Sequence, residues 1–586
     1  MSDKPTMRRF KGDSMNSAIR YLTAVALVST AGVASGQIER TIDAPVGEIR
    51  GERSTEERNV MYYFGVPYAE PPVGENRWRP PEPIESYDDR IDAEAYGAQC
   101  MQPQAGPGAG GGGFGGGRGG RGFAAQGRGG FGGRGGGIRG GGGGIRGGGG
   151  FGAPPVGTSE DCLTLNIWSG AETGDARRPV IVFIHGNRLT QGAASDPRYS
   201  GERLASRGLV VVSFNYRLGV YGFLAHPELS AESGSSGNYG LMDALAALRW
   251  VNRNIGAFGG DPDNVTVLGA SAGAIMTAAL IGSPEAEGLF GRAILQSGSF
   301  MGHGIARTPA LAEAERTGVE RLARFGDVSL AELRALPAEQ LTGVLGDPAI
   351  IVDGRVIPED LARIFERGEQ NAVDVLVGSN KEEGIVFHER SPLSSEIRDE
   401  VPAAYEAAVR GRFGPLADRY LRIYPSGTPE AAAVSNVTAL GDEMAWAMRK
   451  LALSQIEIGN RAHVYAFTRV PPATGAEAAR GATHGTEIQY VFNSMGTFGG
   501  WTDGDRRLAE VISSYWINFA ESGTPDGADR WQGAELPGWP VYTGSEEFQT
   551  MEFGDRIGTN PTWVIVPEKL ELFDEAYAAL LGTVGR

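Results

Sequence analysis

The chain is poor in cysteine, in histidine and in long apolar runs. Its 586 residues include two cysteines and six histidines. After the first few dozen residues, no apolar run is long enough to cross a bilayer. A hydrophobic fraction of 41% nevertheless supplies enough apolar side chains for a large soluble core. One large domain and two smaller ones are both compatible with this composition.

Positive charge is also scarce. Lysine and arginine together number 54 against 71 acidic residues, which gives a net charge of −17. Such a balance argues against a general nucleic-acid binder, because an anionic polymer would have to find a local basic patch. We therefore expect no specific nucleic-acid partner.

The N-terminus carries the features of an export signal. It carries the basic residues Arg8, Arg9, Lys11 and Arg20. They precede an apolar stretch at 21–33 and the small residues 34–36, the layout of a cleavable signal peptide. We therefore predict a signal peptide at 1–36, a mature chain at 37–586 that is secreted or periplasmic, and no stable membrane span after cleavage. An uncleaved anchor is the alternative, although the run is short for a span.

Export bears on the two cysteines, Cys100 and Cys162. In an oxidising compartment two cysteines are able to pair, so a disulfide is favoured over two free buried thiols.

Residues 104–155 form a low-complexity tract. The tract is nearly all glycine, punctuated by arginine and phenylalanine, and contains no acidic residue. With almost nothing to fill a core, it is predicted to be a disordered insertion. Arginine-glycine repeats with aromatics also occur in single-strand nucleic-acid binders, but a solvated loop is the favoured interpretation in an exported protein.

After this tract, apolar runs alternate with helical patterns. The predicted strands are 180–184, 209–214, 265–268, 292–296, 373–377 and 463–467. The predicted helical segments are 240–258, 272–281, 309–345 and 402–456. This alternation is typical of an α/β fold with a mainly parallel sheet and helices on both faces.

A GxSxG pentapeptide, Gly269-Ala270-Ser271-Ala272-Gly273, lies directly between a predicted strand and a predicted helix. In this position the motif predicts a nucleophile elbow, a turn so tight that the residues two before and two after the serine must be small. The following helix would aim its N-terminus and the Ala272 amide at a developing oxyanion. Ser271 is therefore the candidate nucleophile.

A serine nucleophile needs a histidine base, and six histidines allow elimination. His463 begins an apolar strand and is better explained as a core residue. His484 follows that strand in a glycine-flanked loop late in the chain, so it is the candidate base.

The candidate acid follows the predicted strand 373–377. Two adjacent carboxylates, Glu382 and Glu383, stand there, and only one of them can face the imidazole. Glu383, next to Gly384, is favoured, and the order serine, glutamate, histidine is that of α/β-hydrolases. Glu382 is better explained as a solvated loop charge.

Together with longer motifs, these residues resemble the type-B carboxylesterase family, which includes cholinesterase-like and para-nitrobenzyl-esterase-like serine hydrolases. Besides the elbow and His484-Gly485, the motifs are Phe64-Gly-Val-Pro-Tyr-Ala69, Ser159-Glu-Asp-Cys-Leu-Thr-Leu-Asn-Ile-Trp168, Asn215-Tyr-Arg-Leu218, Gly237-Asn-Tyr-Gly240, Gly259-Gly-Asp-Pro262, Ala293-Ile-Leu-Gln-Ser-Gly-Ser299 and Tyr515-Trp-Ile-Asn-Phe-Ala520. The resemblance spans almost the entire mature chain. It implies a single large α/β-hydrolase domain, a buried gorge to the serine, small-molecule ester substrates, and no metal or organic cofactor. It also implies a disulfide between Cys100 and Cys162 that closes a loop near the gorge entrance.

The predicted oxyanion loop departs from the family pattern. Relatives usually have His-Gly-Gly followed by glycine or alanine, whereas this chain has His185-Gly186-Asn187-Arg188. The candidate donors are the amides of Gly186, Asn187, Arg188 and Ala272. Side chains at 187 and 188 restrict the geometry that glycine reaches freely, and the loss of one donor costs a rate factor of about 10² to 10³. Arg188 is either a spectator charge or a partner for an anionic group of the substrate.

The sequence thus predicts a serine hydrolase that cleaves carboxylic esters through an acyl-enzyme. The alternative is a catalytically weak or inactive hydrolase-fold binding or adhesion protein, motivated by Asn187 and Arg188. The acyl and alcohol groups of the substrate and the oligomeric state have no readable signal in the sequence.

Overall fold

A computed structural model describes most of the predicted mature chain. The described residues are 40–103, 157–302, 304–326, 328–344, 346–390, 401–472, 481–496, 500–544, 549–559 and 565–582. The predicted signal peptide and the glycine-rich insertion lie outside these residues, so both stay predictions.

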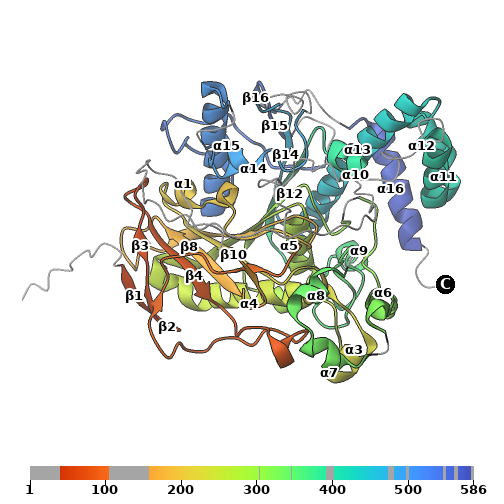
Figure 1. The fold of residues 1–586 in the computed structure, drawn as a ribbon. Helices are drawn as coiled ribbons and strands as arrows, with labels where there is room; N and C mark the ends of the chain where they lie inside the picture. Colours follow the sequence, from red (N-terminus) through yellow and green to blue (C-terminus); the bar gives the residue numbers. More distant parts are fainter. Residues whose placement is uncertain are drawn as a thin grey trace, which may run out of the picture. The chain divides into compact units, whose positions relative to one another are not determined.

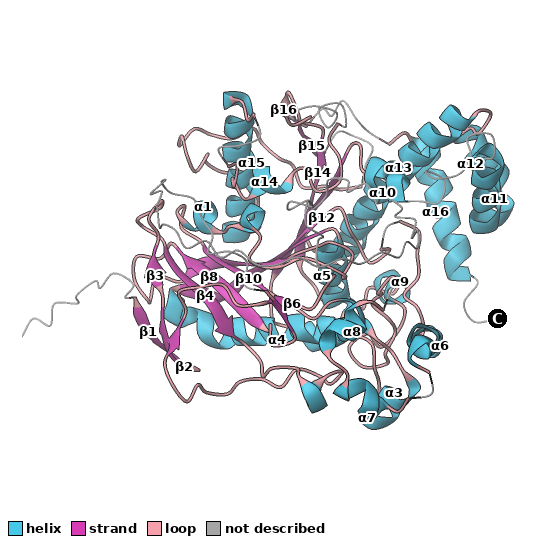
Figure 2. Ribbon diagram, viewed as in Figure 1, coloured by secondary structure: helices cyan, strands magenta, loops and turns pink. Residues whose placement is uncertain are grey.

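Strands from most of the described chain form one eleven-stranded sheet (Figures 1 and 2). In spatial order its strands are β16 (Ile557–Gly558), β15 (Thr550–Phe553), β14 (Ala462–Phe467), β13 (Asp374–Asn380), β12 (Arg292–Gln296), β11 (Gly260–Ala270), β9 (Arg178–Ile184), β10 (Val210–Phe214), β8 (Thr164–Ser169), β4 (Met61–Pro67) and β3 (Glu52–Arg53). From β10 to β15 all neighbours pair in parallel, and antiparallel pairing is confined to the two edges. The predicted mostly parallel sheet is therefore confirmed.

Helices cover both faces of this sheet. They are α1 (Glu202–Ala205), α2 (Gly219–Phe223), α3 (Pro227–Ser233), α4 (Tyr239–Asn254), α5 (Ala272–Gly282), α6 (Leu311–Leu322), α7 (Leu330–Ala335), α8 (Ala338–Thr342), α9 (Leu361–Glu366), α10 (Gly384–Arg390), α11 (Val401–Phe413), α12 (Ala417–Ile423), α13 (Pro429–Glu457), α14 (Ile488–Val491), α15 (Asp503–Ser522) and α16 (Pro567–Gly582). None of the helices in the described ranges is long and apolar enough to be a candidate membrane span.

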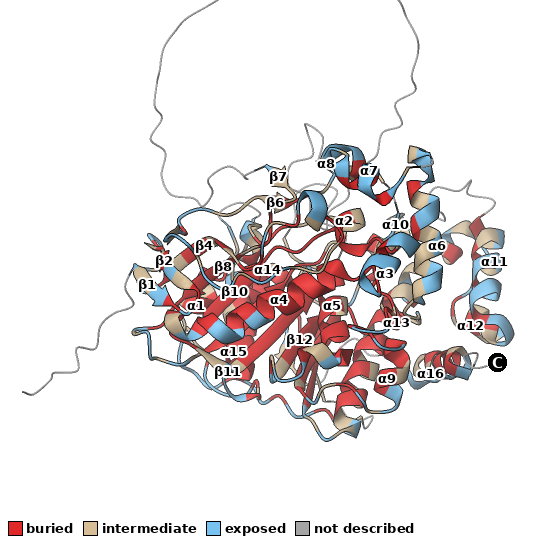
Figure 3. Ribbon diagram, turned by 90° about the horizontal axis from the view of Figure 1, so that it is seen from below, coloured by how far each residue is buried: buried red, intermediate tan, exposed pale blue. Residues whose placement is uncertain are grey.

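The alternation of side chains along a strand separates the core into two clusters. On β9, Val180, Val182 and Ile184 belong to the cluster that includes α4, α5 and α13. Ile181 and Phe183 point the other way and join the cluster that includes α14 and α15. The sheet and helices α4 and α5 are almost wholly buried, whereas α6, α11 and α12 each expose one side (Figure 3).

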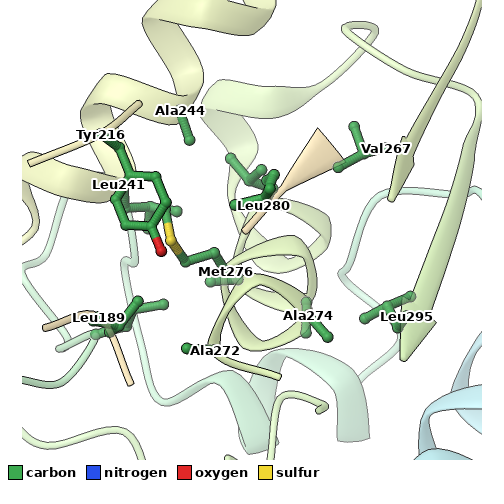
Figure 4. Packing of buried hydrophobic residues seen from close by; sticks show 14 of the residues in the cluster. Leu189, Tyr216, Leu241, Ala244, Val267, Ala272, Ala274, Met276, Leu280 and Leu295 are labelled. Atoms are coloured by element: carbon green, nitrogen blue, oxygen red, sulfur yellow. The ribbon is translucent and has the colours of Figure 1, made fainter. Parts of the chain in front are cut away.

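Helix α5 lies in the middle of the first cluster. Its residues Ala274, Met276 and Leu280 are fully buried. They pack among Leu241 of α4, Val267 of β11 and Leu295 of β12 (Figure 4). Because interiors are close-packed, neighbours on several sides leave this helix no freedom to shift.

Two smaller sheets flank the main one, and one of them brackets the insertion. β1 (Thr41–Ala44), β2 (Gly47–Arg50) and β5 (Ile91–Asp92) form a three-stranded sheet. β6 (Gln99–Cys100) pairs in parallel with β7 (Thr158–Ser159). Cys100 and Cys162 form a disulfide, with an S–S distance of 2.03 Å, as predicted.

Two predicted helical segments are divided in the structure. The segment 309–345 contains α6, α7 and α8, because Ser329 caps a new helix and Pro337 precedes another. The segment 402–456 contains α11, α12 and α13, with Thr428 capping the last. Strand β11 begins at Gly260, five residues earlier than the predicted 265, and its pairing with β9 shifts register between Gly260 and Val265.

His463 is a core residue of β14, as the sequence indicates. It is fully buried, and its ring meets the rings of Phe519 and Trp539 edge to face, with centroids 6.1 Å and 5.9 Å away. Burial lowers the pKa of His463 from 6.5 to about 4, so the folded protein holds this imidazole neutral.

This burial makes stability depend on pH. The contribution of His463 is present above pH 6.5 and is lost as the pH falls towards 4, because the unfolded chain then binds the extra proton. At pH 5 the loss is about 2 kcal/mol. Thermal unfolding of wild type and His463→Phe at pH 7.5 and pH 5 should show a smaller acid-induced fall in Tm for the variant. An equal fall in both proteins would contradict the assignment.

Candidate functional site

Ser271 stands at a strained turn between β11 and α5. Its backbone is at φ 57° and ψ −124°, a region that non-glycine residues rarely adopt. A Cβ on Gly269 would lie 2.3 Å from the carbonyl oxygen of Gly273, and a Cβ on Gly273 would lie 2.0 Å from that of Ile184. Both flanking positions therefore require glycine, which is the physical reason for the GxSxG pattern.

The structure brings Ser271, His484 and Glu383 together in one relay. His484 Nε2 lies 2.7 Å from Ser271 Oγ, and His484 Nδ1 contacts Glu383 Oε2. The exposed fractions of the three residues are 3%, 2% and 0%. In this arrangement the imidazole can take the serine proton while the carboxylate orients it.

Glu383 is held by one donor from the loop after β12 and by one from the end of its own strand, β13. Its Oε1 accepts a hydrogen bond from the Ser297 hydroxyl and another, of 2.8 Å, from the Asn380 amide. Glu382 points elsewhere: its Oε2 accepts from the Ala482 amide at 2.8 Å, and its own amide donates to the Ala482 carbonyl. Glu382 is therefore not simply a solvated charge, because it joins the acid loop to the histidine loop.

Adjacent parallel strands explain why these groups meet. Ser271 follows β11, Ser297 follows β12, Glu383 follows β13 by three residues, and His484 lies beyond β14. Since the carboxyl ends of parallel strands meet at one edge of a sheet, the four loops start side by side. Backbone hydrogen bonds from Ser271 N to the Gln296 carbonyl of β12 and from Ser297 N to the Gly378 carbonyl of β13 join each of these residues to the neighbouring strand.

A second buried carboxylate, that of Glu487, contacts Asn380, which also holds Glu383. It accepts hydrogen bonds from the amide groups of Gln296, at 3.0 Å, and of Asn380. Burial first, and then the charge of Glu383, raises the pKa of Glu487. Ser297, Asn380 and Glu487 all support the site, and sequence reasoning gave a role to none of them. Their signal was weak: Ser297 belongs to a family motif, and Glu487 stands three residues after the histidine.

The loop that the sequence predicts to form the oxyanion hole follows β9 and lies against Ser271. A Cβ on Gly186 would be 2.9 Å from the Cβ of Ser271, so only glycine fits there. Asn187, Arg188 and Leu189 have φ values of 78°, 61° and 60°. Asn187 and Arg188, which stand where relatives have small residues, therefore still adopt a left-handed backbone. Each non-glycine residue in this conformation costs about 1–3 kcal/mol.

Contacts on both sides hold this strained loop in place. Gln102 donates to the Gly192 carbonyl and accepts from the Gly192 amide, both at 2.9 Å. His185 stacks on Tyr216 with ring centroids 4.5 Å apart, and the Tyr216 hydroxyl donates to the His185 carbonyl at 2.8 Å. Burial lowers the pKa of His185 to about 4, so this imidazole is a neutral support for the loop.

Comparison with known proteins agrees with this geometry. The model of the carboxylesterase family matches residues 38–562. The chain is 35% identical to fumonisin B1 esterase of Sphingopyxis macrogoltabida, over 88% of this chain and 87% of that protein. It is 31% identical to para-nitrobenzyl esterase of Bacillus subtilis, over 85% and 91% of the two chains. The solved carboxylesterase EST55 of Geobacillus stearothermophilus has a TM-score of 0.70 and 27% identity, covering 92% of this chain and all of that one.

The two adjacent glutamates allow a matched test of the acid. Glu383→Gln would present an amide to His484 Nδ1 and favour the wrong imidazole tautomer, so kcat should fall by about 10³- to 10⁴-fold. Glu382→Gln keeps an oxygen that can accept from Ala482 and should cost less than about tenfold. Steady-state kinetics on a small aryl ester distinguishes the two variants. A larger loss for Glu382→Gln would contradict the assignment of the acid.

Proposed function

Because this chain belongs to the carboxylesterase family and is a serine hydrolase of carboxylic esters, we propose that Ser271, His484 and Glu383 are its catalytic triad. The single observation that carries the proposal is the continuous relay from Ser271 Oγ through the imidazole to the Glu383 carboxylate. We further propose that the protein works on small-molecule esters outside the cytoplasm.

The chemistry follows from the positions of these groups. His484 Nε2 takes the hydroxyl proton while Ser271 Oγ attacks the ester carbonyl carbon. The imidazolium then gives that proton to the alcohol oxygen as the bond from carbon to this oxygen breaks, which leaves an acyl group on Ser271. A water molecule then gives a proton to the same imidazole as its oxygen attacks the acyl carbon. The bond from that carbon to Ser271 Oγ breaks, the imidazolium returns the proton to Oγ, and the carboxylic acid leaves. Throughout, Glu383 keeps Nδ1 protonated and stabilises the imidazolium.

Backbone amides would hold the charge that develops on the carbonyl oxygen. Ala272 is the first residue of α5, so its N–H has no partner within the helix. The Gly186 backbone also lies close to the serine, followed by Asn187 and Arg188. These are the donors that the sequence predicts for the oxyanion, and together they would supply the electrostatic part of catalysis.

A hydrolase-fold protein with vestigial chemistry is the less favoured interpretation. Loss of a triad member would support it, but all three members are present and in contact. Two of the named relatives are named for quite different esters, those of fumonisin B1 and of para-nitrobenzyl alcohol, so their names do not transfer a substrate to this chain.

Labelling with a fluorophosphonate tests the nucleophile. We expect one covalent adduct per chain, located by mass spectrometry on the peptide that contains Ser271, because the imidazole activates only this hydroxyl. Ser271→Ala should remain folded and unlabelled. A folded wild-type protein that neither reacts nor hydrolyses aryl esters would instead favour the binding-protein interpretation.

Export is supported by the predicted signal at 1–36 and by the disulfide, since disulfides persist in oxidising compartments. Expressed in a Gram-negative host, the full chain should appear in the periplasm or medium with the mass of a chain that starts near Gln37. A variant beginning at Gln37 should stay in the cytoplasm. Recovery of the full-length protein at its unprocessed mass in the membrane fraction would support the uncleaved anchor instead.

A further inference from the structure

A hollow of about 390 Å³ opens beside the oxyanion loop. Its walls come from residues 101–103, 188, 190–191, 218–221, 224, 321, 342, 344 and 346–348. The triad is not among the lining residues, so the hollow is a neighbour of the reacting centre and not its continuation. Gly186 lies against Ser271, and Arg188, which lines the hollow, follows Gly186 by two residues. Two residues span at most about 7 Å of chain.

The strained backbone at Arg188 sets the directions of two neighbouring side chains, those of Arg188 and Leu189. Arg188 is the middle of the three consecutive non-glycine residues with left-handed φ. Leu189 turns inwards and joins the core around α5 (Figure 4), with 5% of its surface exposed. The Arg188 side chain keeps 43% of its surface exposed and lines the hollow. Glycine would avoid the cost at this position, so an arginine there points to a use for its side chain.

Charge in the hollow is positive. The charged side chains among its lining residues are Arg188, Arg321 and Asp347. One nitrogen of Arg188 pairs with the Asp347 carboxylate, and Arg321 donates to the Asp347 backbone carbonyl at 2.8 Å. Among the residues that the structure describes, no carboxylate forms an ion pair with the guanidinium of Arg321.

The Asp347 carboxylate, which already lies beside the hollow, is a weak ligand for Arg188. The Asp347 side chain is 80% exposed, and exposed ion pairs contribute little, because water and salt screen them. A guanidinium presents a fork that matches a carboxylate in two parallel hydrogen bonds. A ligand carboxylate placed between two such forks would therefore compete well with one exposed aspartate.

From these observations we infer that Arg188 and Arg321 form a subsite for a negatively charged group of the ester substrate. The substrate class is an ester that carries a free carboxylate in its acyl or its alcohol part. The ester carbonyl lies at Ser271 while the carboxylate occupies the hollow, and Asp347 holds the two arginines when no substrate is bound. This inference rests on the proposed triad, because it places the hollow relative to the reacting serine.

The test compares kcat/KM for two matched pairs of esters. In the first pair the charge is in the acyl part: mono-4-nitrophenyl adipate against 4-nitrophenyl hexanoate. In the second pair it is in the alcohol part: 4-acetoxybenzoate against its methyl ester. The measured quantity is the ratio of kcat/KM for the anionic member to that for the neutral member, because this ratio cancels any general effect on the triad or the fold.

The variants should move this ratio in opposite directions. Arg188→Gln and Arg321→Gln should each lower it about fivefold in at least one pair, and the double variant more, because charge-assisted hydrogen bonds are lost. Asp347→Asn should raise it, because the carboxylate that competes for the Arg188 guanidinium is removed, while the backbone carbonyl that holds Arg321 stays. The matched control is Arg253→Gln, since Arg253 pairs with Glu85 at nearly the same exposures, 42% and 78%. This control should leave the ratio unchanged.

The outcomes separate the two proposals. A fall of less than about threefold for the double variant in both ester pairs, with neutral esters still hydrolysed, overturns the subsite and leaves the triad intact. If the folded wild-type protein hydrolyses neither the neutral nor the anionic esters, the proposed triad fails and the subsite fails with it.

Discussion

Steric crowding around Ser271 is the constraint on which the rest of the site depends. The serine is forced to a positive φ because β11 ends and α5 begins with no residue between them but the serine itself. Glycines at 269 and 273 permit that approach, and Gly186 permits the oxyanion loop to lie against the serine. A backbone strained by this turn persists only when its surroundings over-determine it, and the tight packing around α5 meets that condition.

The parallel sheet then brings the other groups of the site to the fixed position of Ser271. Parallel pairing of β11 through β14 brings four loops to the same edge, and each loop is hydrogen-bonded to its neighbour. Glu383 accepts from groups that follow β12 and end β13, so its position is set by two strands at once. The relay is thus preorganised by the backbone of the sheet and needs no rearrangement to form.

Some of this arrangement could be predicted from sequence and some could not. Ser271 has a local signature, because the elbow imposes glycine at fixed positions. His484 and Glu383 could be chosen through chain order and the scarcity of histidine. Ser297 and the link from Glu382 to Ala482 depend on which loops become neighbours, and no single stretch of sequence encodes that. The helices show a related limit: 309–345 was predicted to be helical, but the cap at Ser329 and Pro337 divide the segment into three helices.

The disulfide and the pairing of β6 with β7 have a consequence for how this chain can vary. Cys100 and Cys162 fix the two ends of the intervening segment, and Gln102 fastens one of those ends to the oxyanion loop. Residues added or removed between the two anchors therefore need not alter the register of any strand in the main sheet. The reacting groups can therefore keep their places when the length of that segment changes, because the entropy cost of closing a loop grows only slowly with its length.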